Sequence, residues 1–235
     1  MSSIKVYYWP FLARGASLVR MLEHTGTPYE FISDKAEMAK VCSSFGATGT
    51  TFAPPVLVDG DYTIAQSGAA TLYLGHKLGL TPEGYDQFKA TQYILDIVDT
   101  FEGGIGKSNE DGATLKAYLT GPRFASQMGN IERSIAGPFY FGAEPSAVDF
   151  YLLMHLEMRT TSIFGPLRER FGFDALAAFP KVAGVYAALL ATDAYKNYAA
   201  GESKYSQLPH YLGPLKDEIL AAFAPAAPAA EQASE

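Results

Sequence analysis

The chain has 235 residues, of which 48% are hydrophobic and 18% are charged, and its formal net charge is −7. This composition allows a packed core, in one large domain or two modest ones. The negative charge argues against an extended nucleic-acid interface, because such an interface needs clustered Lys and Arg. The chain has no run of about 18 consecutive apolar residues, so we expect no membrane span.

Cysteine usage and the N-terminus indicate the compartment. Cys42 is the only cysteine, so an internal disulfide cannot form. The first residues lack the long apolar core of a secretory signal. Both features favour a reducing, cytoplasmic setting. The four histidines are scattered, with no Cys or His partner at ligand spacing, so we expect no metal site.

Strand and helix signals alternate over the first 80 residues. The first strand, helix and second strand form a parallel βαβ unit, and Asp59–Gly60 is a hairpin signal between two later strands. On the last helix of this half, Ala69, Leu72, Tyr73 and His76 share one face. In chain order, we expect strand 5–9, helix 15–25, strand 29–32, a loose helix and loop to residue 51, strands 55–58 and 62–64, and a helix from residue 67.

Residues 80–84 have the composition of a linker, and strand signals largely disappear beyond them. Helical patterns follow at 93–98, 113–119, 123–135, 146–158, 182–190 and 212–223. The last residues are rich in Ala and Pro. We therefore expect an α/β domain over residues 1–80, an all-helical domain over 86–222 and a disordered tail over 223–235.

Tyr8 is the first candidate for chemistry. It lies at the carboxyl end of the first strand and just before a helix, where ligands of α/β sheets usually bind. A phenol there can donate a hydrogen bond to a thiolate, and the helix end adds partial positive charge. Position alone favours an ordinary core aromatic. Because neighbouring strand residues point to opposite faces, only one of Tyr7 and Tyr8 can face a ligand.

Two further segments are informative only in combination. Pro54–Pro55 precedes a strand, and an X-Pro bond is the peptide bond most often found in the cis form. Gln66–Ser67 opens a helix whose free amides, hydroxyl and dipole suit a carboxylate. Taken singly, a rigid turn and a simple N-cap are the commoner interpretations.

Together these segments resemble the glutathione transferase family. Residues 6–10, Val-Tyr-Tyr-Trp-Pro, look like its first strand, and residues 54–61 with Gln66–Ser67 match its Pro-Val-Leu-x-Asp-Gly … Gln-Ser signature. Ser146 and Asp149 have the spacing of a capping box, within a motif that resembles the start of the family's buried central helix. Residues 179–181 and 194–198 resemble its late helices, so the resemblance covers about residues 4–200.

The resemblance implies a thioredoxin-like domain followed by a helical one, a homodimer, and glutathione as co-substrate without a metal. It places Tyr8 at the glutathione thiol, as in the mu-, pi- and sigma-like classes. Gln66 and Ser67 would hold the γ-glutamyl end, and Pro54, before the cis-proline Pro55, would present its carbonyl to the cysteinyl amide. The thiolate would then attack a small hydrophobic electrophile.

Departures from the family pattern affect the expected site. Leu12–Ala13 stand where Arg-Gly is usual, and Arg14 follows as a candidate contact for glutathione. Pro54 lacks the N–H that normally binds glutathione, which predicts weaker affinity. The acidic residue that often follows the first long helix is not at its expected place, where Gly103–Gly104 stand. We expect Trp9 and Phe11, beside Tyr8, to line the electrophile pocket.

Two other functions stay open, because fold does not decide between them. The chain could be a non-catalytic binding or assembly module, or a glutathione-dependent isomerase in which the thiolate adds and later leaves. Residues 101–108 end like a phosphate loop, but they follow a helix and lack its first glycine. Cys42 has no obvious activating neighbour, which argues against a thiol nucleophile.

Overall fold

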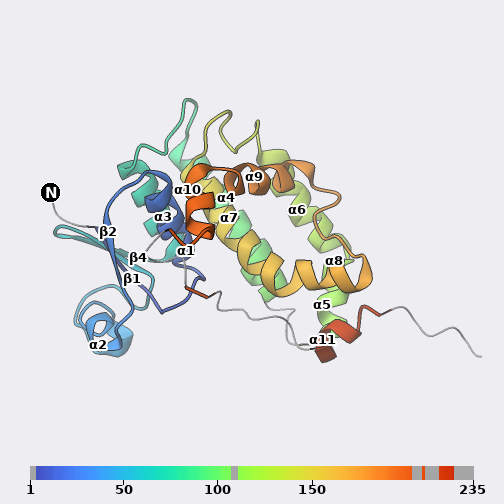
Figure 1. Cartoon of the computed structure of the whole chain (residues 1–235), viewed down its shortest axis with the longest axis horizontal. Coiled ribbons are helices and arrows are strands. Elements are labelled where there is room, and N and C mark those ends of the chain that lie inside the picture. The colour runs from blue at the N-terminus through green and yellow to red at the C-terminus, as the bar shows by residue number, and fades with distance from the viewer. Residues whose placement is uncertain (1–3, 107–110, 203–207, 210–216, 225–235) are drawn as a thin grey trace, which may run out of the picture.

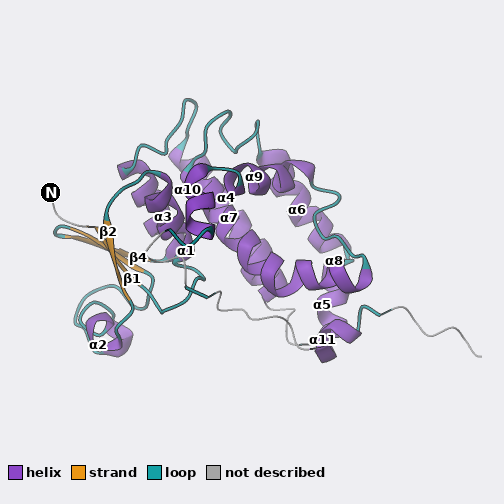
Figure 2. Cartoon of the chain, viewed as in Figure 1, coloured by secondary structure: helices purple, strands orange, loops and turns teal. Residues whose placement is uncertain are grey.

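The computed structural model describes residues 4–106, 111–202, 208–209 and 217–224. A small sheet with its flanking helices occupies one side of the molecule, and a larger group of helices occupies the other (Figures 1 and 2). None of the described helices is long and apolar enough to cross a bilayer.

The sheet has four strands in the order β2-β1-β3-β4. β1 pairs with β2 in parallel and with β3 antiparallel, and β3 and β4 form an antiparallel hairpin. This arrangement confirms the thioredoxin-like fold expected from the sequence. The strands are β1 (Ile4–Tyr7), β2 (Tyr29–Ile32), β3 (Val56–Asp59) and β4 (Tyr62–Ala65).

The two faces of the sheet carry different cores. Val6 and Leu57 pack into a large core that includes residues of α1 (Ala16–His24) and α3 (Ser67–Lys77). The neighbouring residues Tyr7 and Val56 belong to a smaller core beneath α2 (Lys35–Met38). The alternation of side chains along β1 therefore sends successive residues to opposite faces.

The second half is helical. In the described residues beyond 100, the only extended pairing is an isolated bridge between Phe139 and Gly142, so the expected change to helices is confirmed. Two π-helical segments, Asp99–Gly106 after α4 and Thr160–Phe164 after α7, were not predicted, and neither was α8. The helices are α4 (Gln87–Val98), α5 (Gly112–Leu119), α6 (Pro122–Ser134), α7 (Ala147–Arg159), α8 (Gly165–Phe171), α9 (Pro180–Leu190), α10 (Asp193–Ala199) and α11 (Asp217–Ala221).

Part of the C-terminal expectation lies outside the described residues. The helix predicted over 212–223 is described only from Asp217, where α11 begins. Residues 225–235 of the predicted tail also fall outside the description. The division near residues 80–86 stays a proposal, because one continuous core extends across it from Ile4 to Phe223.

Helix α7 is the centre of the helical half, and all of its residues are buried. It begins with the predicted capping box: the Ser146 N–H donates to Asp149 Oδ2 at 2.8 Å, and the Ser146 hydroxyl donates to the same atom at 2.6 Å. Asp149 Oδ1 also accepts the Tyr140 N–H at 2.9 Å. Burial raises the pKa of Asp149 to about 6, against the lowering effect of these bonds.

A buried ion pair joins the two halves. Arg20 of α1 donates to both carboxylate oxygens of Glu157 on α7, at 3.0 and 2.6 Å. Tyr195 of α10 donates to Glu157 Oε1 at 2.9 Å, and the Arg20 guanidinium lies 3.8 Å from the ring centre of Tyr198. The first helix is therefore fixed to α7 and α10 by charge as well as by apolar packing.

Candidate functional site

Tyr8 follows β1 directly and enters the core that joins the sheet to the helices. Its N–H donates to Ile32 O at 3.0 Å, and its side chain is 5% exposed. Tyr7 instead packs with Met38 and Val56 on the opposite face. The two tyrosines thus point to different sides, as their alternation predicted.

The loop after β1 orients the Tyr8 hydroxyl. The Arg14 N–H donates to Tyr8 Oη at 3.0 Å, which occupies one acceptor position of the oxygen. Gly15 lies against the ring, because a Cβ at that residue would be 2.7 Å from Tyr8 Cγ. Burial raises the pKa of Tyr8 to about 12, although the Arg14 N–H acts in the lowering direction. The phenol is therefore protonated at neutral pH and keeps its proton available for donation.

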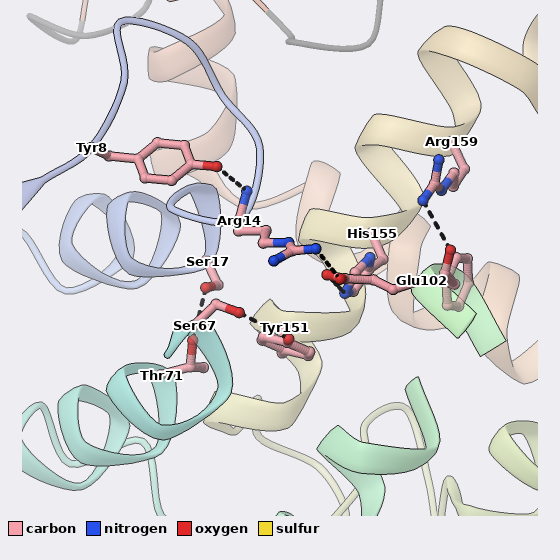
Figure 3. A network of polar contacts seen from close by, with 10 residues as sticks. Tyr8, Arg14, Ser17, Ser67, Thr71, Glu102, Tyr151, His155 and Arg159 are labelled. Atoms are coloured by element: carbon pink, nitrogen blue, oxygen red, sulfur yellow. Dashed lines mark hydrogen bonds and ion pairs between the residues drawn. The ribbon is translucent and has the colours of Figure 1, made fainter. Parts of the chain in front are cut away.

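The Arg14 side chain extends away from Tyr8 into a polar cluster (Figure 3). Its guanidinium pairs with Glu102, on the π-helical segment after α4. His155 Nε2 lies 4.0 Å from Glu102 Oε1, and neither ring nitrogen of this fully buried histidine has a hydrogen-bond partner among the described residues. Burial, with smaller contributions from the charges of Arg159 and Arg14, lowers the pKa of His155 to about 3, so the ring is neutral.

The start of α3 forms a second polar group. Gln66, with φ of 67°, is the only non-glycine residue at positive φ among those described, and such strain is often found at functional sites. Ser67 follows as the first residue of α3, and its Oγ lies 3.1 Å from Tyr151 Oη on α7. Since the first N–H groups of a helix lack intrahelical partners, this end suits an anion.

A cleft of about 720 Å³ connects these groups. It brings together Arg14, Gln66 and Ser67, and the predicted face of α3 with Ala69, Leu72, Tyr73 and His76 forms one of its walls. Its complete lining is Arg14, Tyr62, Ile64, Gln66, Ser67, Gly68, Ala69, Leu72, Tyr73, His76, Tyr85, Gln87, Thr91, Ile94, Leu95, Val98, Glu102 and Tyr151.

Other predicted site residues lie outside this cleft. Tyr8 does not line it, and neither do Trp9 and Phe11. Phe11 packs edge-on against Tyr8 with ring centres 5.8 Å apart, and Trp9 packs against Phe45 at 5.7 Å. The Pro54–Pro55 peptide bond is cis, as predicted, but neither proline is among the lining residues.

Three polar residues of the helical half were missed by the sequence reasoning: Glu102, Tyr151 and His155. Tyr151 and His155 are four residues apart on α7, the spacing that puts two side chains on one helix face. That spacing was a usable signal. Glu102 lies directly before Gly103–Gly104, where the family resemblance led us to expect an acidic residue, and it was missed because α4 changes to π-helical geometry there. Within the described ranges, no group of three or more His, Cys, Asp or Glu is arranged to hold a metal ion.

No protein-family model matches the chain, and no curated protein matches it. Solved structures do resemble it. A prostaglandin synthase D of Nilaparvata lugens has 21% identity and a TM-score of 0.63, covering 86% of this chain and 98% of that one. A pi-class glutathione S-transferase of Onchocerca volvulus has 20% identity and a TM-score of 0.64, covering 85% and 93%. A glutathione S-transferase III in apo form has 17% identity and a TM-score of 0.63, covering 85% and 96%.

At these identities the likeness shows the fold. The chain has the fold of glutathione S-transferases, with a thioredoxin-like domain followed by a helical domain.

Proposed function

We propose that this protein is a glutathione transferase that ionises the glutathione thiol and conjugates it to a small hydrophobic electrophile. The supporting observation is Tyr8, a buried phenol that keeps its proton and whose oxygen is oriented by the Arg14 N–H at 3.0 Å. A free thiol has a pKa of about 8.5, so only a few per cent is thiolate at neutral pH. The enzyme's task is to raise that fraction.

The Tyr8 hydroxyl stabilises the thiolate by donating its proton in a hydrogen bond. Because the Arg14 N–H occupies one side of the oxygen, the O–H proton can point toward the bound sulfur. A bond that favours the charged sulfur and lowers its pKa by about two units corresponds to about 2.7 kcal/mol. The thiol proton leaves to solvent, and the sulfur lone pair then forms the bond to the electrophilic carbon. In a substitution the bond from that carbon to its leaving group breaks and the group departs with the electron pair; in an addition the π electron pair moves onto the electrophile, which takes a proton from solvent.

Glutathione binding is proposed at the start of α3. The Ser67 hydroxyl, Gln66 and the free helix amides would hold the γ-glutamyl carboxylate. By resemblance, the Pro54 carbonyl, before Pro55, accepts the cysteinyl N–H. Pro54 has no N–H to return, so we expect weaker glutathione binding than a donor at that position would give.

A homodimer is proposed from exposed apolar side chains, of which Leu95 and Tyr62 also line the cleft. Phe88 is 88% exposed and Leu95 is 58% exposed, and both lie on α4 seven residues apart, which is one helix face. Tyr62 and Phe52 are also exposed, at 49% and 68%. A second copy of the chain would cover such a surface. We propose that this dimer is cytoplasmic, since Cys42 is the only cysteine of the chain.

A non-catalytic binding module is the second candidate. Trp9 and Phe11 lie outside the cleft, so no wall for an electrophile is formed there by the predicted residues. The missing N–H of Pro54 favours the same candidate. In such a protein, glutathione would bind without turnover.

Glutathione titration followed by a panel of electrophiles tests the proposal, with Tyr8→Phe and the adjacent Tyr7→Phe as a matched pair. We expect Tyr8→Phe to lower the conjugation rate by about one to two orders of magnitude with nearly unchanged glutathione affinity. Tyr7→Phe should have little effect, because Tyr7 packs in the opposite core. Binding without turnover would favour the non-catalytic module, and turnover that requires but does not consume glutathione would favour an isomerase.

The γ-glutamyl site has its own test. Ser67→Ala removes one charge-assisted hydrogen bond, worth about 1.5–3 kcal/mol, so the glutathione dissociation constant should rise by at least tenfold. Thermal stability should also fall, because the substitution leaves the buried Tyr151 hydroxyl without Ser67 Oγ, so the titration is made on protein shown to be folded. An unchanged dissociation constant would place the carboxylate elsewhere.

A further inference from the structure

Glu102 reaches the site from the opposite half of the molecule. It lies on the π-helical segment Asp99–Gly106, and such segments are often found at functional sites. Two carbonyls of this segment accept hydrogen bonds from side chains outside it: Arg159 donates to Phe101 O at 2.9 Å, and Tyr118 donates to Thr100 O at 3.2 Å. The backbone that carries Glu102 is therefore held in place.

Arg14 takes part in two interactions that face different ways. Its N–H donates to Tyr8 Oη, whereas its guanidinium extends in the other direction to Glu102 (Figure 3). The loop that positions the N–H is held by its own backbone bonds, from Leu12 N–H to Pro209 O at 2.7 Å and from Ala16 N–H to Ala13 O at 2.8 Å. Loss of Glu102 would therefore release the guanidinium without moving the N–H.

Positive charge predominates around Glu102. Two guanidiniums face it, those of Arg14 and Arg159, while the neighbouring His155 is kept neutral by burial. The charge of Arg14 lowers the pKa of Tyr8, and that of Glu102 raises it. On Tyr151 as well, the charge of Arg14 lowers the pKa and that of Glu102 raises it. The pair therefore influences both tyrosines of the site.

We propose that Glu102 is a positioning residue that holds the Arg14 guanidinium away from Tyr8 and cancels its charge, so that the Tyr8 hydroxyl, and not an unpaired cation, stabilises the glutathione thiolate. This inference rests on the proposed function. It assigns Arg14 and Glu102 one joint role, in which the ion pair acts as a nearly neutral unit beside the sulfur.

The sign of each substitution follows from this pairing. Glu102→Gln keeps an oxygen for the Arg14 guanidinium but removes the negative charge, so the pKa of the bound thiol should fall by about half a unit to one unit. The side chain of Arg14 is 57% exposed, and solvent screening keeps the shift this small. Arg14→Gln leaves Glu102 unpaired and should raise the thiol pKa. Arg14→Gln with Glu102→Gln should return it to within about 0.3 units of the unmodified protein.

The experiment is a pH titration of thiolate absorbance for glutathione bound to these variants. Glu30→Gln is the matched control, because it removes the same charge from an exposed pair with Lys5 on the sheet and should leave the pKa unchanged. S-methylglutathione, which has no thiol proton, should bind the unmodified protein and Glu102→Gln equally well. An unchanged or raised thiol pKa in Glu102→Gln would overturn the proposal.

Two further measurements separate this inference from its foundation. In glutathione-free protein, Glu102→Gln should lower the pKa of the Tyr8 phenol, followed by NMR of ring-labelled tyrosine and assigned with Tyr8→Phe. That measurement is valid even if the protein proves not to be a transferase. An unchanged pKa of the Tyr8 phenol would overturn the proposed role of the pair. If Glu102→Gln does not fold, Arg14→Gln carries the test, and a thiol pKa that does not rise in that variant refutes the role of Glu102.

Discussion

Gly15→Ala tests whether the position of Tyr8 controls the chemistry. A Cβ at residue 15 would lie 2.7 Å from Tyr8 Cγ, 2.8 Å from Cδ1 and 3.2 Å from Cβ. These atoms form the base of a ring that is 5% exposed, so they cannot swing aside as the tip of a flexible chain would. Gly15 has φ of −83°, which any residue adopts. Alanine is therefore disfavoured at residue 15 only because its Cβ has no space.

The displacement that an added Cβ requires is large for a catalytic group. Ordinary carbon contacts are about 3.5–4.0 Å, so the ring or the start of α1 must move by about 1 Å. Overpacking of this kind costs about 1–3 kcal/mol of stability. A misplacement of about 1 Å in a catalytic group can cost about 100-fold in rate. The Arg14 N–H to Tyr8 Oη bond, now 3.0 Å, would lengthen or bend.

The assay compares conjugation rate, bound-thiol pKa and thermal midpoint for Gly15→Ala and Gly184→Ala. Gly184 lies within α9 and has nothing within 4 Å of an added Cβ, so its substitution should be neutral or stabilising, by up to about 1 kcal/mol. We expect Gly15→Ala to remain folded, with a rate about 10- to 100-fold lower and a higher thiol pKa. A folded Gly15→Ala protein with an unchanged rate would refute the reasoning.

Three other predictions concern the buried charges and the assembly. His155 has a pKa of about 3 in the folded chain against 6.5 when unfolded, so between these values the unfolded state binds more protons. The folded state therefore loses stability as the pH decreases below 6.5. The loss attributable to His155 is about 1.6 kcal/mol between pH 6.5 and 5, and His155→Phe should reduce the slope of denaturant midpoint against pH; an equal slope contradicts this. Glu157→Gln leaves Arg20 as an unpaired buried charge and should cost about 3–5 kcal/mol in urea unfolding, and a cost below about 1 kcal/mol would contradict a structural role for the pair. Leu95→Glu should convert the dimer to monomers in sedimentation, and an unmodified protein that is already monomeric would refute the proposed interface.

The sequence predicted most of the sheet, because its strands are short and bounded by clear turns. Tyr29–Ile32 was predicted with the bounds that the structure has, and the Asp59–Gly60 signal marked the hairpin. The first strand was predicted too long. It ends at Tyr7, ahead of Pro10, and Tyr8 faces the helices because side chains alternate along the strand.

The helical half was predicted by its periodicity, and its irregular parts were missed for a physical reason. The two π-helical segments add residues to a turn, so they break the helical period that marks α4 and α7. Glu102 lies in one of these breaks, and its partnership with Arg14 joins residues that are 88 positions apart. No local pattern could have predicted that contact.

The candidate site was predicted in part. Local signals made Tyr8, Gln66 and Ser67 candidates, because each lies at the end of a strand or the start of a helix. Arg14, Gln66 and Ser67 do line one cleft. Trp9 and Phe11 do not, because their rings pack against Phe45 and Tyr8 instead. Pairings with distant side chains decide where an aromatic ring lies, and spacing along the chain does not report them.

The most direct test of the account is the pKa of the glutathione thiol when it is bound to the unmodified protein and to Tyr8→Phe, measured by thiolate absorbance against pH. We expect the unmodified protein to lower that pKa by about two units from its free value of about 8.5, and Tyr8→Phe to return most of the shift. A thiol that titrates alike in both proteins would contradict the assignment of Tyr8 as the group that stabilises the thiolate.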